Sequence, residues 1–368
     1  MKILILEPYL TGSHASWANE YAARSAHEVT VLGLEGRHWK WRMHGGAVTL
    51  ARRFLAGDDA PDCIIASDML DLTTFLAMTR GRTAHVRTAV YFHENQLTYP
   101  WSEQDTDPVR DRDAHYGFIN YASALAADAV FFNSRYHLDS FLAALEPFLG
   151  AFPDHGEVEN VARIRDRSRV LPLGLDLKRF DLHRSGRPRS GAPLVVWNHR
   201  WEYDKNPEGF FRALFRLQDM DCTFEVAVLG ERFHEAPAIF TEAARRLGSR
   251  IVRFGYAEDF DEYAAWLWRA DIRPVTSIHD FFGASVVQAI YCNCYPLLPK
   301  RLAYPEHIPA EHHDAFLYGD DEGLLGMLRN RLVHIEETRG YETQDFVSGY
   351  DWTSMAPQYD RLIENLLF

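Results

Sequence analysis

The chain has 368 residues, of which 47% are hydrophobic and 13% aromatic, so it is long and apolar enough to bury the cores of two domains. Its formal net charge of −13 argues against a nucleic-acid partner, because phosphate binding normally needs a basic surface. The acidity is unevenly distributed, however. Residues 1–190 hold 22 Lys and Arg against 24 Asp and Glu, whereas the remainder holds 17 against 28. Because the first part contains local basic runs, a polyanionic partner is retained as an alternative.

The cysteines and the N-terminus indicate the compartment. The four cysteines form no paired CxxC set, which favours a reduced protein without a disulfide framework or zinc ribbon. The first apolar run stops at Glu7 and is too short for the core of a signal peptide. We therefore expect a cytoplasmic protein without stable membrane association.

Short strand-like runs alternate with amphipathic helical patterns through the first part of the chain. The helix that follows the first strand is expected from Ser13 to about Ala26. This alternation predicts a doubly wound parallel sheet in an α/β fold. The expected strands are 2–7, 28–34, 61–67, 88–94, 128–134 and 169–176.

A Pro-, Arg-, Gly- and Ser-rich segment then interrupts the alternation, and we interpret residues 178–192 as a linker. The pattern restarts and predicts a second Rossmann-like domain over 193–351, after an N-terminal domain over 1–177. Residues 352–368 are expected as a helix that crosses back to the first domain. The expected strands of the second domain are 193–200, 223–230, 250–255, 271–277 and 294–299.

Neither domain carries GxGxxG after its first strand, and no GxxxxGK[ST] occurs, so simple NAD binding and P-loop chemistry lose support. Two such domains that face each other across a cleft would bind a ligand at the carboxyl ends of their strands. The candidate residues should therefore follow strands.

Two polar motifs follow strands of the first domain. In "TGSHASW", Gly12 permits a tight turn, and Ser13 or His14 opens a helix whose free N–H groups suit an anion, although a serine there is more often a simple N-cap. In "YFHENQLTYP", four polar residues in succession (93–96) are costly to bury without partners. A satisfied polar turn is the alternative to a loop that faces a substrate.

Two further motifs follow strands of the second domain. In "WNHRWEYDKNPE", Arg200 and Lys205 bracket a turn before a helix that opens at Pro207, and two cations there can neutralise a leaving diphosphate. Exposed surface cations are an equally good interpretation. In "HDFFGASVVQAI", Asp280 can accept hydrogen bonds from sugar hydroxyls, while Gly283 begins a helix that could present N–H groups to a phosphate.

A strip of aromatic and basic residues, "GRHWKWRMHGG", interleaves Trp39 and Trp41 with cations. Base stacking with phosphate contact and simple packing of a loop are equally good explanations. The His-rich "EHIPAEHH" has neither HExxH spacing nor cysteine partners, which favours a polar loop over a metal site.

Five motifs resemble the tRNA-queuosine α-mannosyltransferase family, within the GT-B glycosyltransferases of family 4, and the similarity covers nearly the whole chain. They are "GSHASW", "KWRM", "YFHENQLTYP", "NHRWEYDKNPE" and "CNCYPLLPKRLAYPE". The resemblance implies retaining transfer of mannose from GDP-mannose to the cyclopentene diol of queuosine at the wobble position of a tRNA. GT-B enzymes work without a divalent metal, so no cofactor and no metal are expected.

The resemblance also implies roles for particular residues. The residues implied in catalysis are Arg200, Lys205, His93 and Asp280, with the two cations on the donor diphosphate. Those implied in donor binding are Gly12, Ser13, His14, Phe282, Gly283, Ala284 and Gln288. Those assigned to the acceptor are Glu94, Asn95, Gln96, Trp39 and Trp41.

The chain departs from the family-4 pattern at two positions. Both ends of the acidic-x7-acidic motif are usually glutamate, but this chain has Asp280 and Gln288. Glutamine lacks the charge that strengthens a hydrogen bond to ribose, which puts donor affinity or identity in question. The alternatives are the same chemistry on a small sugar, lipid-linked glycan or other modified nucleoside, a non-catalytic RNA- or sugar-nucleotide-binding module, and a GT-B-like epimerase.

Overall fold

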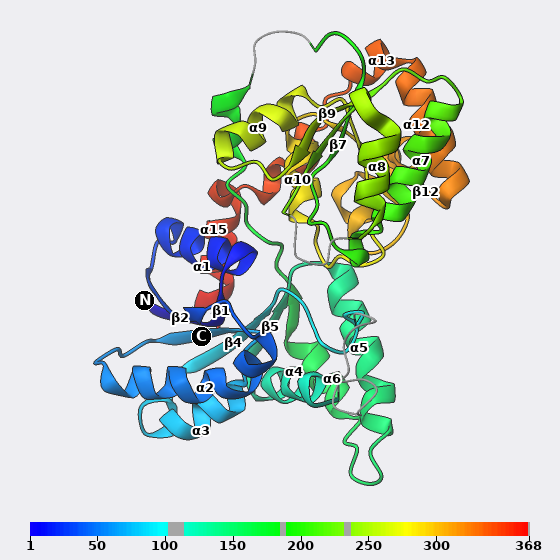
Figure 1. The fold of residues 1–368 in the computed structure, drawn as a ribbon. Coiled ribbons are helices and arrows are strands. Elements are labelled where there is room, and N and C mark those ends of the chain that lie inside the picture. Colours follow the sequence, from blue (N-terminus) through cyan, green and yellow to red (C-terminus); the bar gives the residue numbers. More distant parts are fainter. Residues whose placement is uncertain (102–113, 185–188, 232–236, 367–368) are drawn as a thin grey trace. The chain divides into compact units, whose positions relative to one another are not determined.

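The computed structural model describes residues 1–101, 114–184, 189–231 and 237–366. The chain divides into two compact units. Unit 1 comprises Met1–Leu175 and Trp352–Phe368, and unit 2 comprises Asp176–Asp351. Each unit is built around a six-stranded parallel sheet, which confirms the predicted fold class of two Rossmann-like α/β sheets (Figure 1). The domain boundaries given above stay predictions.

The sheet of unit 1 has the strand order β2-β1-β3-β4-β5-β6. All six expected strands form, and β1 runs three residues further than its sequence pattern indicates. Its pairing with β2 shifts register between Glu7 and Leu10, which places Glu7 inside the strand. The strands are β1 (Lys2–Leu10), β2 (Glu28–Glu35), β3 (Cys63–Ser67), β4 (Arg87–Phe92), β5 (Ala129–Phe132) and β6 (Ser168–Val170).

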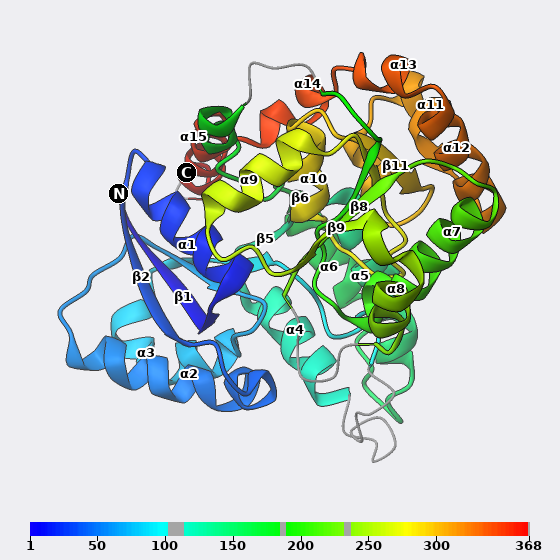
Figure 2. The ribbon, with the colours of Figure 1, turned by 45° about the horizontal axis from the view of Figure 1, so that its top comes forward.

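Helices cover both faces of this sheet, as a doubly wound fold requires. In Figures 1 and 2, α1 and α15 lie on one face, and α2 and α3 lie side by side on the other. A large apolar cluster from Leu4 to Ile164 fills the layer between strands and helices. The helices are α1 (Gly12–Arg24), α2 (Trp39–Ala56), α3 (Leu72–Thr83), α4 (Ala114–Ala126), α5 (Arg135–Gly150), α6 (Asn160–Arg167) and α15 (Trp352–Glu364).

The C-terminal helix α15 packs on α1 within unit 1. The hydroxyl of Tyr21 donates to Asp360 at 2.8 Å, and the indole N–H of Trp17 donates to the hydroxyl of Tyr359 at 3.2 Å. Trp352 is buried at the start of the helix and donates to Glu20 at 2.6 Å. Buried hydrogen bonds of this kind fix the register of two packed helices, because breaking one leaves an unsatisfied polar group.

The sheet of unit 2 has the strand order β12-β11-β10-β7-β8-β9. The five expected strands form, although several are shorter than predicted. A sixth strand, β12, was not predicted because two residues carry no periodic signal. The strands are β7 (Leu194–Trp197), β8 (Glu225–Leu229), β9 (Ile251–Gly255), β10 (Ile272–Pro274), β11 (Tyr295–Pro299) and β12 (Leu317–Tyr318).

Residues 178–192, predicted as a linker, begin with a 3-10 helix, η2 (Lys178–His183), in which Phe180 is buried against Phe260. Residues 185–188 of this segment lie outside the described residues. The other helices of unit 2 are η3 (Tyr203–Lys205), α7 (Pro207–Asp219), α8 (Ile239–Leu247), η4 (Gly248–Arg250), α9 (Phe260–Arg269), α10 (Ala284–Tyr291), η5 (Tyr304–His307), η6 (Ala310–His312), α11 (His313–Phe316), α12 (Asp321–Val333), α13 (Ile335–Arg339), α14 (Gln344–Val347) and η7 (Ser348–Tyr350).

Each strand order reverses direction at one place, and ligands of doubly wound sheets bind outside the carboxyl ends of strands at such a place. In unit 1 the reversal lies between β1 and β3, and in unit 2 between β7 and β10. The motifs "TGSHASW", "WNHRWEYDKNPE" and "HDFFGASVVQAI" follow β1, β7 and β10. The fold therefore places all three where a ligand is expected.

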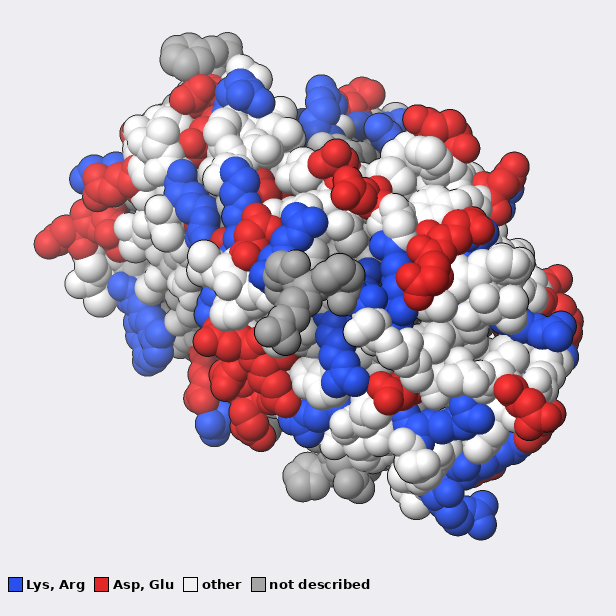
Figure 3. All heavy atoms as spheres, turned by 90° about the horizontal axis from the view of Figure 1, so that it is seen from above, with Lys and Arg blue, Asp and Glu red and all other residues white. Residues whose placement is uncertain are grey.

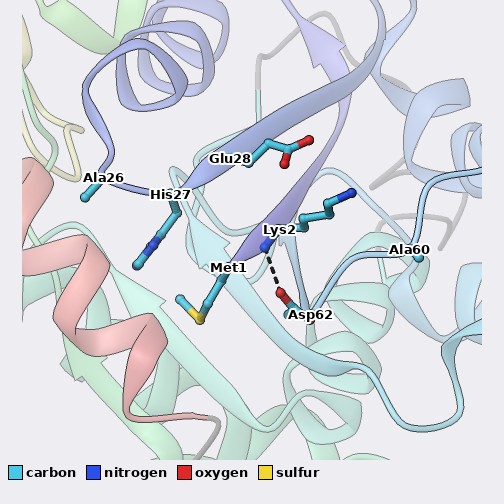
Figure 4. Close-up of a pocket in the computed structure, with 7 residues that line it drawn as sticks. All are labelled: Met1, Lys2, Ala26, His27, Glu28, Ala60 and Asp62. Carbon is cyan, nitrogen blue, oxygen red and sulfur yellow. Dashed lines mark hydrogen bonds between the residues drawn. The ribbon is translucent and has the colours of Figure 1, made fainter.

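A surface hollow lies at the opposite, amino ends of the unit-1 strands (Figure 4). Met1, His27 and Glu28 line it, and the backbone N–H of Lys2 donates to Asp62 at 2.8 Å. This end of a parallel sheet is not where the fold positions ligand-binding loops. Among the described residues, no helix is both long and apolar enough to cross a membrane.

Candidate functional site

The helix that follows β1 begins at a glycine that takes the left-handed conformation. Gly12 has φ of +51°, and a Cβ at this position would meet nothing within 4 Å. Thr11 precedes the helix without a side-chain cap, and the first turn contains no acidic residue. The start of α1 therefore offers open space and backbone N–H groups, with Ser13 exposed beside them.

Glu7 and His14 form a buried pair between β1 and α1. Glu7 is fully buried, and its Oε2 lies 2.9 Å from Nδ1 of His14, while its Oε1 accepts the backbone N–H of Tyr9 at 2.8 Å. Burial alone would lower the pKa of His14, but the charge and hydrogen bond of Glu7, together with the charges of Asp68 and Glu94, outweigh burial and raise it to about 9. His14 is therefore an imidazolium at neutral pH.

His93 directly follows β4, and its ring packs against His14 at a tilt of 38°, but it has the opposite protonation state. The two ring centroids lie 4.2 Å apart, and the edge of Trp17 contacts His93 at 4.7 Å. Burial and the neighbouring charge of His14 hold the pKa of His93 well below its ordinary value, so this ring is neutral. Among the described residues, none hydrogen-bonds to the buried Nε2 of His93. An unsatisfied buried nitrogen is unusual, and a ligand would satisfy it.

Asp68 fixes the backbone of His93 from the neighbouring strand β3. Its Oδ1 accepts the N–H of His93 at 2.7 Å, and burial raises the pKa of this carboxyl well above its ordinary value. The carbonyl of His93 accepts from the amide of Asn133 at 2.9 Å. Both backbone groups of His93 are thus held, so its ring has a defined position.

The rest of the turn after β4 is partly internal. Asn95 is fully buried, and its Oδ1 accepts the backbone N–H groups of Leu97 and Thr98, which are the contacts of a residue that forms the turn. Gln96 donates to Glu94 at 3.0 Å, and Glu94 is half-buried. Of the three residues predicted to face the acceptor, Glu94 and Gln96 have the more accessible position in this turn.

Glu7, His14 and His93 are also the one described set of three residues whose ligand atoms all lie within 4.8 Å of one another, the spacing of a metal site. The hydrogen bond between Glu7 and His14 already occupies one atom of each. The two ring planes are tilted by 38° with centroids only 4.2 Å apart, so the rings already contact each other. We therefore interpret the set as a proton-sharing pair beside a neutral imidazole.

The two tryptophans predicted at the acceptor side have different surroundings. Trp39 begins α2 and packs against Trp101 and Tyr116, with ring centroids 6.0 and 5.2 Å away. Trp41, in contrast, is 65% exposed. The packing explanation therefore fits Trp39, whereas Trp41 is open to a partner.

In unit 2, the two predicted cations after β7 have different environments. Arg200 is half-exposed and forms an ion pair with Glu202 at 3.0 Å. Lys205 is buried, and its ammonium lies 3.0 Å from Asp204 and 3.4 Å from Asp280. Burial would lower the pKa of Lys205, but Asp280 and Asp204 outweigh burial and raise it. Lys205 is thus a fixed cation, and Arg200 is the more accessible one.

Asp280 is prepared as an ionised acceptor. Burial would raise its pKa, but Lys205 and the hydroxyl of Tyr304, which donates at 3.1 Å, help to hold it below the ordinary value. Gly283 follows with φ of +86°, and a Cβ there would lie 3.1 Å from the ring of Tyr304. The glycine therefore permits both the turn and the close approach of the tyrosine.

The helix α10 starts at Ala284 directly after this glycine, and no described side chain caps it. The carbonyl of Phe282 accepts from Nε2 of His307 at 2.6 Å, so the loop before the helix is anchored. The start of α10 thus resembles that of α1, with a left-handed glycine and an uncapped first turn. The helix α7 differs, because Asn206 caps it.

Gln288 lies one turn further along α10. Its Oε1 accepts the hydroxyl of Tyr263 at 2.8 Å, and the amide of Asn198 donates to the same tyrosine at 3.0 Å. The fully buried Arg273 donates from its Nε to Oδ1 of Asn198. Burial lowers the pKa of the Arg273 guanidinium to about 10. A polar network thus fixes the orientation of Gln288.

Several residues that shape these two sites were not predicted. The signals were present in the sequence: Glu7 and Asp68 are carboxylates directly attached to apolar strand runs, and such groups are costly to bury without a partner. The tyrosines have no comparable signal in the sequence, because aromatic residues are common in any core. The residues that sequence reasoning missed are Glu7, Asp68, Asn133, Asp204, Asn198, Tyr263, Arg273 and Tyr304.

Comparison with known proteins bears on both units. A family model described as "tRNA-queuosine alpha-mannosyltransferase N-terminal" matches residues 2–175. A tRNA-queuosine alpha-mannosyltransferase of Drosophila melanogaster is 34% identical over 370 residues, which cover 97% of this chain and 95% of the relative. A relative this similar over both chains shows the family.

Solved structures show the same fold at low sequence identity. The trehalose-6-phosphate phosphatase N-terminal domain of Candida albicans superimposes with a TM-score of 0.73 at 12% identity and covers 99% of this chain and 97% of its own. Sucrose-phosphate synthase of Thermosynechococcus elongatus gives 0.70 at 15% identity, covering 100% and 99%. HepE of Anabaena, solved with UDP, gives 0.66 at 16% identity, covering 99% and 100%. This likeness supports the GT-B fold alone.

Proposed function

Because this chain belongs to the tRNA-queuosine alpha-mannosyltransferase family, we propose that it transfers mannose from GDP-mannose to the cyclopentene diol of queuosine at the wobble position of a tRNA. The observation that carries the proposal is the 34% identity that extends over 97% of the chain and therefore through both units. The reaction would take place in the cytoplasm, where tRNA is modified.

Unit 2 would bind the donor. Arg200 is accessible, and its surface ion pair with Glu202 is weak enough to be exchanged for a diphosphate oxygen. Lys205 would supply a second positive charge from its buried position while keeping Asp280 ionised. The first turn of α10, after Phe282, Gly283 and Ala284, would present N–H groups to the phosphates.

Asp280 and Gln288 would hold the two sugars of the donor. The Asp280 carboxylate, fixed by Tyr304, would accept hydrogen bonds from the hydroxyls of the transferred sugar. Gln288 would contact the ribose. Because Tyr263 already occupies one lone pair of its amide oxygen, Gln288 would offer the ribose its other lone pair and its N–H groups.

Unit 1 would supply the groups next to the anomeric carbon. The unsatisfied Nε2 of His93 would hydrogen-bond to a hydroxyl of the transferred sugar. The imidazolium of His14, together with the N–H groups after Gly12, would stabilise negative charge on the leaving diphosphate. Glu94 and Gln96 would face the acceptor.

We propose a front-face, retaining reaction. The acceptor hydroxyl oxygen forms a bond to the anomeric carbon on the side from which the diphosphate leaves. The bond from that carbon to the β-phosphate oxygen breaks, and a β-phosphate oxygen takes the proton of the acceptor hydroxyl. The products are GDP and mannosyl-queuosine. No protein base is needed, so the main task of the cations is to stabilise the leaving group.

The test is an incubation of the protein with GDP-mannose and tRNA that contains queuosine, followed by digestion and mass spectrometry of the nucleosides. The proposal expects a hexose increment on queuosine and none on tRNA that has guanosine at the wobble position. UDP-glucose and GDP-fucose run in parallel test the donor. Donor and tRNA binding without any transfer would identify a non-catalytic binding module instead.

A further inference from the structure

The indole of Trp41 lies against helix α2 at Gly45. Gly45 is four residues further on, so it lies one turn away on the same face of the helix. A Cβ at Gly45 would lie 2.7 Å from both Cε2 and Cζ2 of the indole and 3.1 Å from its Nε1, and these are its three nearest neighbours. The indole therefore covers the helix where only a glycine leaves room, and its other face contributes to the 65% exposure of Trp41.

The two adjacent glycines of α2 have different reasons to be there. A Cβ at Gly46 would lie 2.8 Å from Cβ of Pro8, so Gly46 allows α2 to approach strand β1. At Gly45 the neighbour is the Trp41 indole, which faces solvent. A glycine inside a helix costs about 1 kcal/mol relative to alanine. A half-buried helix position that carries this cost without any core packing is characteristic of a functional surface.

The surroundings of Trp41 are cationic. Helix α2 contains four Lys and Arg residues and no Asp or Glu, although the whole chain has a net charge of −13. Arg42 follows Trp41 in the chain, and its Nε and Nη2 both donate to the carbonyl of Glu35 at 3.1 Å, so its charge has a fixed position at the start of α2. On the face of the molecule in Figure 3, acidic and basic side chains intermix.

The exposed residues on this side of α2 do not form a continuous apolar strip. His44 and Arg52 are exposed between Trp41, Val48 and Leu55. A helix that inserts into a lipid interface needs an apolar face without such interruptions. A flat aromatic ring among cations is instead the arrangement that binds single-stranded nucleic acid, in which bases stack and phosphates meet the positive charges.

We propose that Trp41, which lies against the helix at Gly45, is a stacking platform for an unpaired base in a loop of the bound RNA, with the cations of α2 facing the neighbouring phosphates. The proposal rests on the proposed function only in taking tRNA as the partner. It separates Trp41, which binds RNA, from Trp39, which anchors the start of α2 to Trp101 and Tyr116.

The most specific test is Gly45→Ala. The added methyl group would occupy the position of the indole and tilt Trp41 away from the helix, while alanine would raise the stability of α2. The matched control is Gly81→Ala in α3 of the same unit, where a Cβ would meet nothing within 4 Å. Thermal unfolding of both variants shows that the fold is retained.

Binding is measured with a synthetic anticodon stem–loop and with a duplex RNA that has no loop. Stacking of one base on an aromatic side chain contributes about 1–3 kcal/mol, so Trp41→Ala and Gly45→Ala should each weaken stem–loop binding about 5- to 150-fold. Gly81→Ala should bind like the wild type, and duplex affinity should change little in any variant. Since Gly45 acts through Trp41, adding Gly45→Ala to Trp41→Ala should have no further effect.

Three results would overturn the platform: unchanged stem–loop affinity in Trp41→Ala, an equal loss in Gly81→Ala, or a loss confined to binding of anionic lipid vesicles. The mannosyl-transfer assay is read separately. If transfer fails while stem–loop binding depends on Trp41, the proposed function is wrong and the platform stands. If transfer succeeds with the same KM for tRNA in Trp41→Ala, the platform is wrong and the function stands.

Discussion

The replacement Glu7→Gln tests the charge state of the neighbouring histidines His14 and His93 in unit 1. Glu7 contributes most to raising the pKa of His14 to about 9 from 6.5, against the effect of burial, and the charges of Asp68 and Glu94 add to it. A shift of about 2.5 units corresponds to about 3 kcal/mol of stability. Because the folded-state pKa is raised, this stability is fully present below pH 6.5 and is lost as the pH rises to 9. Glutamine removes the charge, so burial then lowers the pKa of His14.

Two measurements follow the change. NMR titration of histidine ring protons, with His14→Gln to assign the resonance, should place His14 near pH 9 in the wild type and at a lower pH in Glu7→Gln. Urea unfolding should show a stability advantage of the wild type of about 3 kcal/mol at pH 6, most of which disappears by pH 9.5. The control is Glu28→Gln, which removes an exposed carboxylate at the start of β2. A His14 resonance that titrates equally in wild type and Glu7→Gln would refute the reasoning.

Two further substitutions test the donor site, and one dialysis experiment tests whether Glu7, His14 and His93 bind a metal. Arg200→Ala should lower kcat about 10²- to 10³-fold, because the side chain stabilises the leaving group. The melting temperature should not change, because this side chain is half-exposed. If Arg200→Ala and the exposed-surface control Arg212→Ala are equally active, Arg200 does not belong to the site. Gln288→Glu should lower the KM for GDP-mannose several-fold, since a carboxylate still accepts from Tyr263 and binds a ribose diol more strongly, and a raised KM would argue against a ribose contact. Exhaustive dialysis against EDTA should leave turnover unchanged, and loss of activity that Zn²⁺ or Mn²⁺ restores would show that Glu7, His14 and His93 hold a metal.

The sequence predicted the strands well because parallel strands buried on both faces have a continuous apolar signal. The sequence also placed the motifs at the ends of strands. The strand orders show that three of these motifs follow strands at the two reversals. The two-residue strand β12 lacked such a signal. The register shift of β1 between Glu7 and Leu10 was equally invisible, and so was the pairing of Glu7 with His14.

Side-chain environment was the part that the sequence did not determine. Arg200 and Lys205 were equivalent cations in the sequence. In the structure, Lys205 is buried and forms ion pairs with Asp204 and Asp280, whereas Arg200 stays accessible. Trp39 and Trp41 were likewise equivalent in the sequence. Their difference depends on Trp101 and Tyr116, which are distant in the chain, so no local pattern contains it.

The most direct test of the account is the mass of queuosine recovered from tRNA after incubation with GDP-mannose and the wild-type protein, with Arg200→Ala as the matched blank. The account predicts a hexose increment on the nucleoside with the wild type and little with the variant, together with release of GDP in equal amount. Queuosine of unchanged mass, in a reaction where the protein is folded and binds GDP, would contradict it.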